Sequence, residues 1–101
     1  MIARIWHGVV PVEKADAYLY LMRNIALADY KGISGNRGAF ALHRIDGSVV
    51  HFIMLSLWES ANAVKGFAGE DVEVAKYYDF DRYFLIEIEP HVDHYRVYEA
   101  S

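Results

Sequence analysis

The sequence predicts an α+β fold of the ferredoxin-like type, with one four-stranded antiparallel sheet and two helices. Two observations lead to this prediction. Segments rich in β-branched and aromatic residues alternate with helix-patterned segments in the order β-α-β-β-α-β. The chain has 101 residues, which is near the usual size of one domain, so residues 1–101 are expected to form a single domain.

The first half of the chain supplies a strand, a helix and the start of a hairpin. Residues 2–10 are apolar on both faces and predict a strand, and Pro11 suits the first turn of a following helix. Apolar residues then recur at spacings of three and four, which predicts an amphipathic helix of about 16–18 residues. A glycine-rich loop precedes a second strand over 37–45. The apolar stripe of the helix comprises Val12, Ala15, Tyr18, Leu19, Met22, Ile25 and Ala26.

The second half completes the hairpin and adds a short helix and a last strand. Asp46-Gly47 predicts a tight turn into a third strand over 49–58. Ser60 is a candidate N-cap for a helix over 61–68. Gly69 ends that helix, and residues 70–78 are expected to add one or two helical turns. Residues 84–88 are expected to begin the last strand, which 92–98 continue after an interruption at Pro90.

The composition excludes several classes of function. The chain has no cysteine, which removes thiol catalysis, disulfides and zinc–thiolate sites. No apolar run approaches the roughly 20 residues that span a bilayer, and the N-terminus lacks a signal-peptide pattern. We therefore expect a cytoplasmic protein without a membrane partner. The net charge is −4 and the ten Lys and Arg residues are scattered singly, so nucleic acid is not an expected partner.

The chain carries more apolar and aromatic side chains than a small monomer easily buries. Hydrophobic residues make up 54% of the sequence and aromatic residues 15%. The third predicted strand is apolar on both faces, which indicates that both faces of the sheet are covered. Because the helices cover one face, we expect a second copy of the chain to cover the other, giving a homodimer.

A two-residue turn at Asp46-Gly47 would pair Ile45 with Ser48 and so decide which side chains share a face. One face would mix small and bulky residues and leave room for a flat ligand between the sheet and the helices. The other would be uniformly bulky and suit the dimer interface. The mixed face comprises Ala39, Ala41, His43, Val50, Phe52, Met54, Ser56 and Trp58. The bulky face comprises Phe40, Leu42, Val49, His51, Ile53, Leu55 and Leu57.

The third strand and the helix after it resemble the antibiotic biosynthesis monooxygenase family. Residues 52–60 read FIMLSLWES, and an amphipathic helix with Ala63 and Phe67 follows. In that family an apolar third strand typically ends in Trp, then an acidic residue and Ser or Thr. The resemblance implies a dimeric α+β barrel. The members of the family include cofactor-independent oxygenases that act on anthrones and quinols, and haem-degrading oxygenases.

The haem-degrading branch of the family matches less well. Its site is formed by an Asn on the first strand, the Trp that ends the third strand, and a haem-ligating His on the second helix. Trp58 matches the Trp. The Asn position falls near Trp6 or His7, and residues 61–78 contain no His. Neither haem nor another cofactor is therefore expected.

The resemblance implies a cofactor-independent monooxygenase that acts on a flat aromatic, quinol or polyketide-like molecule with dioxygen. Such chemistry needs a base near neutral pH, a dry pocket and polar groups that stabilise an anion. His7 and His43 are the candidate catalytic bases. The candidate binding residues are Trp6, Phe52, Trp58, Tyr77 and Tyr78 as aromatic walls, and Asn24 and Arg37 as anion stabilisers. The alternative is a dimeric ligand-binding or stress-related domain without catalysis on the same fold.

The two histidines nearest the C-terminal end, His91 and His94, are weak candidates for metal ligands. His91 and Asp93 share a face of the predicted last strand, and a distant His would complete the facial triad of non-haem iron enzymes. A polar, half-exposed strand accounts for the same residues. His91 and His94 point to opposite faces, which makes a poor chelate, so no metal is expected.

Two acidic residues, Glu87 and Glu89, share one face of the predicted last strand. They would either keep an exposed edge from pairing with another chain or pair across strands with Arg4 or Arg96. Both roles are structural.

Overall fold

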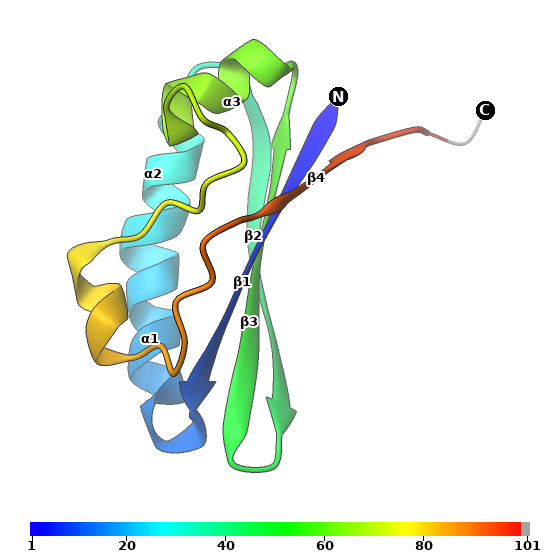
Figure 1. The fold of residues 1–101 in the computed structure, drawn as a ribbon. Helices are drawn as coiled ribbons and strands as arrows, with labels where there is room; N and C mark the ends of the chain where they lie inside the picture. The colour runs from blue at the N-terminus through cyan, green and yellow to red at the C-terminus, as the bar shows by residue number, and fades with distance from the viewer. Residues whose placement is uncertain (100–101) are drawn as a thin grey trace.

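The computed structural model describes residues 1–99 and has an α+β fold, with a four-stranded antiparallel sheet and helices on one of its faces (Figure 1). The spatial order of the strands is β2-β3-β1-β4, which is compatible with the predicted ferredoxin-like fold. All helical segments lie on the same side, so within the described residues no helix covers the other face of the sheet, which we call the open face (Figure 1). The strands are β1 Ile2–Pro11, β2 Asn36–Asp46, β3 Val49–Trp58 and β4 Asp93–Arg96.

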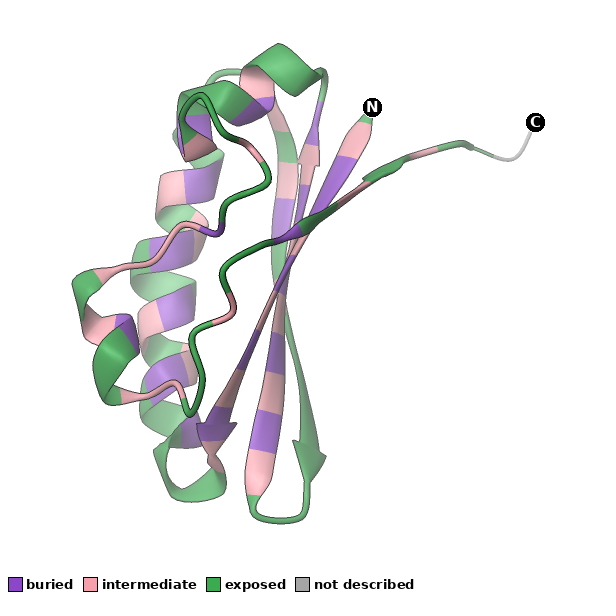
Figure 2. Ribbon diagram, in the orientation of Figure 1, coloured by how far each residue is buried: buried purple, intermediate pink, exposed green. Residues whose placement is uncertain are grey.

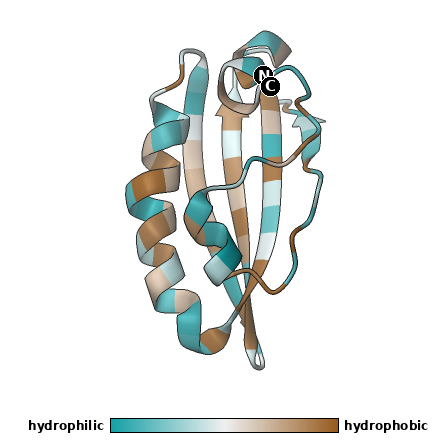
Figure 3. Cartoon of the chain, turned by 60° about the vertical axis from the view of Figure 1, so that its left-hand side comes forward, coloured by the Kyte–Doolittle hydropathy of each residue, from teal (hydrophilic) through white to brown (hydrophobic). Residues whose placement is uncertain are grey.

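The first helical segment continues from residue 12 to residue 31 and changes its hydrogen-bonding pattern on the way. It begins as a 3-10 turn, and a five-residue π-helical stretch, Met22–Ala26, separates α1 (Ala15–Leu21) from α2 (Leu27–Lys31). The prediction of about 16–18 helical residues is therefore too short, because the helical segment continues to Lys31. In Figure 3 its apolar bands alternate with hydrophilic ones.

The buried stripe of this segment differs from the predicted one at its margins. Val12 and Ile25 were expected to face the core but are exposed. Val12 lies in the opening 3-10 turn, before the α-helical spacing begins. Ile25 lies in the π-helical stretch, which adds a residue to one turn and so moves the stripe around the helix axis. The residues that face the sheet are Ala15, Tyr18, Met22, Ala26 and Tyr30.

The β2–β3 hairpin confirms the predicted faces but not the predicted turn. The turn residues are Gly47 and Ser48, and Ile45 pairs with Val50 rather than with Ser48. Gly47 has a φ of 62°, in the left-handed region that glycine favours. Because the register differs from the predicted one by an even number of residues, every side chain keeps its face. The mixed face packs on the helices, and β3 alternates buried and half-buried residues along its length (Figure 2).

The chain after β3 is less regular than expected. Ser60 caps α3 (Ala61–Ala68) as predicted, because its Oγ accepts a hydrogen bond from the Ala63 N–H at 3.2 Å. Residues 70–78 are not helical, and one of them, Val74, forms an isolated β-bridge with His91, whereas a 3-10 helix forms at Asp79–Tyr83. Residues 84–88 belong to no strand, and the short β4 alone replaces the predicted last strand.

Two buried polar side chains hold this irregular segment in place. Arg4 is 1% exposed, and its guanidinium donates to the carbonyls of Val72 at 2.6 Å and Val74 at 3.2 Å. Asp81 is 2% exposed and accepts a hydrogen bond from the Tyr18 hydroxyl at 2.7 Å. These long-range contacts, rather than local periodicity, determine the path of residues 70–92.

Candidate functional site

Two histidines and two carboxylates form a continuous series of contacts on the open face of the sheet. Glu89 Oε2 lies 2.6 Å from His7 Nδ1, and His7 Nε2 lies 2.9 Å from His51 Nδ1. His51 Nε2 lies 3.4 Å from Asp46 Oδ2. The two imidazole rings are stacked, with centroids 5.2 Å apart. We call these four residues the histidine chain.

The register of the central strands brings the two imidazoles together. His7 on β1 pairs with Ile53 on β3, and Val9 pairs with His51. His7 and His51 are therefore diagonal neighbours on one face, a distance that long side chains can bridge. Both lie on the face opposite the helices, because their strand neighbours on the other face are buried.

Glu89 reaches the sheet from the irregular segment that precedes β4. The Ile86 N–H donates to the Val9 carbonyl at 2.9 Å, which ties the segment to β1. The Tyr77 hydroxyl donates to the Glu89 carbonyl. Glu89 therefore contacts His7, rather than one of the arginines considered from the sequence.

The histidine chain borders a hollow of about 240 Å³. Leu42 and Ile53 provide apolar walls, and His7, one of the two predicted bases, lines the hollow together with His51. The other predicted base, His43, also borders the hollow, but it pairs with Phe52 on the mixed face, and its ring lies 5.5 Å from the Phe52 ring on the helix-facing side. The residues around the hollow are His7, Leu42, His43, Arg44, His51 and Ile53. The predicted binding residues are not among them.

The space beside Trp58, where a flat ligand was expected, is filled by side chains of the chain itself. Trp58 is fully buried, and its indole N–H donates to Ser56 Oγ at 2.9 Å. Its ring lies against Tyr30 and Phe67, with centroids 6.5 Å and 5.7 Å away. Phe52 is equally buried. These aromatic side chains form the core between the sheet and the helices.

Trp6, Tyr77 and Tyr78 also belong to that side of the sheet. Trp6 is 3% exposed and packs edge-on against Tyr77, with centroids 6.0 Å apart. The Tyr78 hydroxyl donates to Asp29 Oδ2 at 2.6 Å, and burial raises the pKa of Tyr78. Of the three, Tyr77 reaches the histidine chain, through its hydrogen bond to the Glu89 carbonyl.

The two predicted anion stabilisers lie elsewhere on the surface. Asn24 is exposed on the π-helical stretch, and its side-chain amide donates to the Tyr20 carbonyl at 2.7 Å. Arg37 is exposed at the start of β2 and donates to Glu59 Oε2 at 2.8 Å. The structure brings neither of them to the hollow beside His7.

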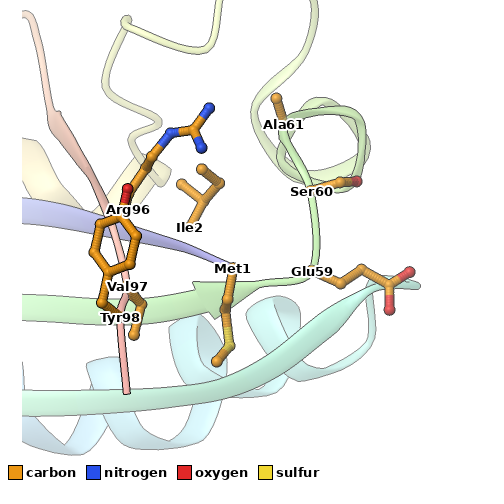
Figure 4. Close-up of a pocket in the computed structure, with 8 residues that line it drawn as sticks. All are labelled: Met1, Ile2, Glu59, Ser60, Ala61, Arg96, Val97 and Tyr98. Atoms are coloured by element: carbon orange, nitrogen blue, oxygen red, sulfur yellow. The ribbon is translucent and has the colours of Figure 1, made fainter. Parts of the chain in front are cut away.

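A second hollow, of about 350 Å³, lies where the N-terminus, the start of α3 and the residues after β4 meet (Figure 4). Its charged side chains, Arg96 and Glu59, point in different directions in Figure 4. Glu59 is already paired with Arg37, and the Ser60 hydroxyl caps α3. The polar groups of this hollow therefore do not converge on one point.

A third polar cluster lies on the helix-facing side, where β4 meets β1. Arg4 Nη1 lies 3.1 Å from His94 Nε2, and His94 Nδ1 lies 3.7 Å from Glu73 Oε1. A guanidinium can only donate, so His94 Nε2 accepts and the ring is neutral. Burial and the neighbouring Arg4 hold the pKa of His94 below its usual value. This cluster joins the strands and is structural.

No protein-family model matches the chain, and no curated protein matches it. Among residues 1–99, no three His, Asp or Glu side chains gather closely enough to hold a metal ion. Within the same range, no helix has the length and apolar character that crossing a membrane requires.

Of the four residues of the histidine chain, sequence reasoning proposed His7 as a base but did not propose His51, Asp46 or Glu89, and His43, the other proposed base, lies outside the chain. The sequence places His51 on the bulky face of the hairpin. A histidine among apolar neighbours needs a polar partner, so this position indicated that His51 contacts another polar side chain. The partner could not be named, since β1 and β3 are not adjacent in the sequence and their register was unknown.

Proposed function

We propose that this chain is a small cofactor-independent monooxygenase, as its resemblance to the antibiotic biosynthesis monooxygenase family implies, with the histidine chain as its base. The observation that supports the proposal is the His7–His51 pair, held between two carboxylates beside a hollow with apolar walls. An imidazole oriented by a carboxylate is suited to removing a proton from a weak acid near neutral pH.

The proposed substrate is a flat aromatic molecule with an acidic CH₂ or phenolic OH group, such as an anthrone or a quinol. Loss of a proton to the base leaves an electron-rich anion that reacts with dioxygen. For an anthrone, the CH₂ group becomes a carbonyl, and the second oxygen atom leaves as water with the two hydrogens. The substrate supplies all the electrons, so the reaction needs no external reductant. The protein supplies the base, the orientation and the exclusion of water.

The proposed active form is a homodimer, a dimeric α+β barrel in which two open sheet faces pack together. Phe40 and Leu42 on this face are 51% and 47% exposed, although both are large and apolar. A second copy would cover them and close the hollow beside the histidine chain against water. A dry site strengthens the interaction of a base with its carboxylate partners.

Oxygen uptake tests the enzymatic proposal. The purified protein is incubated with a panel of anthrones and quinols, and with haem, while dissolved oxygen is followed. Labelled dioxygen then shows whether one of its atoms enters the product. We expect uptake with at least one anthrone or quinol and one labelled oxygen atom in the product. Absence of turnover on the whole panel would remove the support for an oxygenase, and a Soret shift with haem would favour the haem-degrading branch.

A matched variant controls for a general effect of losing a histidine. His91 is exposed and lies outside the histidine chain and the hollow. His91→Gln should therefore turn over the same substrate at the wild-type rate.

The closed core beside Trp58 favours a second candidate function, a dimeric ligand-binding domain without catalysis. Because Tyr30 and Phe67 fill that space, the ligand would bind in the hollow on the open face instead. In this case an aromatic compound from the panel would raise the melting temperature of the protein. It would be recovered unchanged, with no oxygen consumed.

A further inference from the structure

We propose that His51, rather than His7, takes the proton, and that His7 and Glu89 are positioning residues that select its reactive nitrogen. The inference rests on the proposed function, because it names the atom at which the proposed base acts. It assigns a role to His51, Asp46 and Glu89, none of which was a candidate from the sequence.

Both ring nitrogens of His7 are already engaged. Nδ1 lies 2.6 Å from Glu89 Oε2, and Nε2 lies 2.9 Å from His51 Nδ1. Both distances are those of hydrogen bonds. His7 can therefore accept a proton from a substrate only after one of these contacts breaks. His51 has one engaged nitrogen: Nδ1 contacts His7, whereas Nε2 lies 3.4 Å from Asp46 Oδ2 and forms no hydrogen bond with the side chains or backbone of residues 1–99.

The positions of the hydrogens follow from what each group can donate or accept. The Glu89 carboxylate accepts, so the hydrogen of a neutral His7 is on Nδ1 and its lone pair is on Nε2. That lone pair must accept from His51 Nδ1, because two lone pairs would repel each other at 2.9 Å. A neutral His51 then has its lone pair on Nε2. Glu89 and His7 thus leave a basic nitrogen at the end of the chain, on a residue that lines the hollow.

Asp46 is placed to stabilise the product of proton transfer. Once Nε2 of His51 carries a hydrogen, the charged ring can donate from Nδ1 to His7 and from Nε2 toward Asp46. A carboxylate beside an imidazolium favours the charged form. Arg44 Nη1 lies 3.9 Å from the same Asp46 oxygen and is the cation that faces this end of the chain. With the side chain of Asp46 59% exposed, the proton can pass from this end to solvent.

The tautomer of His51 is the direct test, and it requires no substrate. In ¹⁵N-labelled protein at a pH where the ring is neutral, two- and three-bond ¹H–¹⁵N correlations show which nitrogen carries the hydrogen. We expect the hydrogen on Nδ1 of His51 in the wild-type protein. In His7→Phe the acceptor at Nδ1 is lost and Asp46 is the remaining acceptor, so the hydrogen should move to Nε2. His43→Phe is the matched control, because His43 lines the same hollow outside the chain, and it should leave the hydrogen on Nδ1.

Kinetics test the catalytic part of the inference once the panel has yielded a substrate. His51→Gln should lower kcat by about 10²–10⁴-fold, the usual contribution of a general base. His7→Phe should lower kcat less and also change the pH dependence of kcat, which a purely structural role would not do. Glu89→Gln keeps a hydrogen-bond acceptor of the same size, so its kcat should lie between the kcat of His7→Phe and that of the wild type.

The outcomes separate this inference from the proposed function. A hydrogen on Nε2 of His51 in the wild-type protein, or an unchanged tautomer in His7→Phe, would overturn the positioning role whether or not a substrate is found. If His51→Gln still turns over the substrate but His7→Gln or His43→Gln does not, the base is the histidine whose replacement abolishes turnover, and not His51. A panel without turnover would count against the oxygenase alone, and the tautomer result would still decide the positioning role.

Discussion

His94 and His51 show at the residue scale how a neighbour decides what an imidazole can do. His51 lies beside the carboxylate of Asp46, which can only accept a hydrogen bond, whereas His94 lies beside the guanidinium of Arg4, which can only donate one. Glu73 and Asp93 are the acidic groups near His94, and they offset burial and Arg4 only in part, because the pKa of His94 is lowered. The same side chain is thus suited to accepting a proton on one face of the sheet and to remaining neutral on the other.

The lowered pKa of His94 predicts a loss of stability in weak acid. The unfolded chain takes up a proton near the ordinary value of 6.5, whereas the folded chain resists it. The contribution of His94 is therefore fully present above that value and is lost as the pH falls below it. His94→Gln keeps an acceptor for Arg4 but cannot titrate, so its free energy of unfolding should fall less between about pH 7.5 and pH 5.5. Urea unfolding at several pH values measures this difference.

His91→Gln is the control for this pH dependence. His91 is exposed, so its replacement should leave the slope of stability against pH as in the wild type. Equal slopes for the wild type and His94→Gln would contradict the assignment of the effect to His94.

At the scale of elements, the connection from α2 to β2 shows how one glycine allows α3 to pack closely against the preceding loop. Gly35 has a φ of 88°, and its carbonyl accepts a hydrogen bond from the Glu59 N–H at 3.0 Å. A Cβ at this position would lie 2.5 Å from the Cβ of Ala63 on α3. Gly35 in the glycine-rich loop therefore allows the loop to pack closely against α3.

Gly35→Ala should destabilise the protein more than Gly69→Ala. Gly69 has the same φ of 88° but would place its Cβ in open space. Both substitutions carry the backbone strain of a positive φ, about 1–3 kcal/mol. Only Gly35→Ala adds the clash with Ala63, so the difference in free energy of unfolding isolates the packing effect. Equal losses, measured by urea unfolding, would contradict the close contact.

At the scale of the whole molecule, the dominant feature is the open face of the sheet. The helices all lie on the other face (Figures 1 and 2), and the irregular segment runs beside β1, where Ile86 and Glu89 contact it. Phe40 and Leu42 therefore stay about half exposed within residues 1–99. The histidine chain lies on the same open face. The proposed homodimer would therefore cover the apolar surface and enclose the proposed site in a single step.

Phe40→Glu should convert the proposed dimer to a monomer, because it places a charge in the middle of the covered face. Ile25→Glu is the matched control: Ile25 is 44% exposed, close to the 51% of Phe40, but it lies on the helical segment. Sedimentation equilibrium should give a dimer mass for the wild type and Ile25→Glu, and a monomer mass for Phe40→Glu. Circular dichroism checks that all three are folded. A wild-type monomer at every concentration, or a dimer in Phe40→Glu, would contradict this interface.

The sequence by itself determined the parts of the fold that depend on neighbouring residues. Alternating and helical periodicity located β1, β3 and α3, and Ser60 marked the start of α3 because capping is a local hydrogen bond. The faces of β2 and β3 followed from a hairpin whose turn was misplaced, because an even shift in register preserves every face.

Only the tertiary structure decided the path of residues 70–92 and the composition of the candidate site. His7 and His51 are 44 positions apart in the sequence, and His7 and Glu89 are 82 apart. No local preference of the backbone encodes such contacts. They arise because β3 pairs with β1, and because Arg4 and Asp81, buried in the core, hold the segment that carries Glu89. The sequence therefore determined that His7 lies on a central strand, and the packing of distant segments decided which groups surround it.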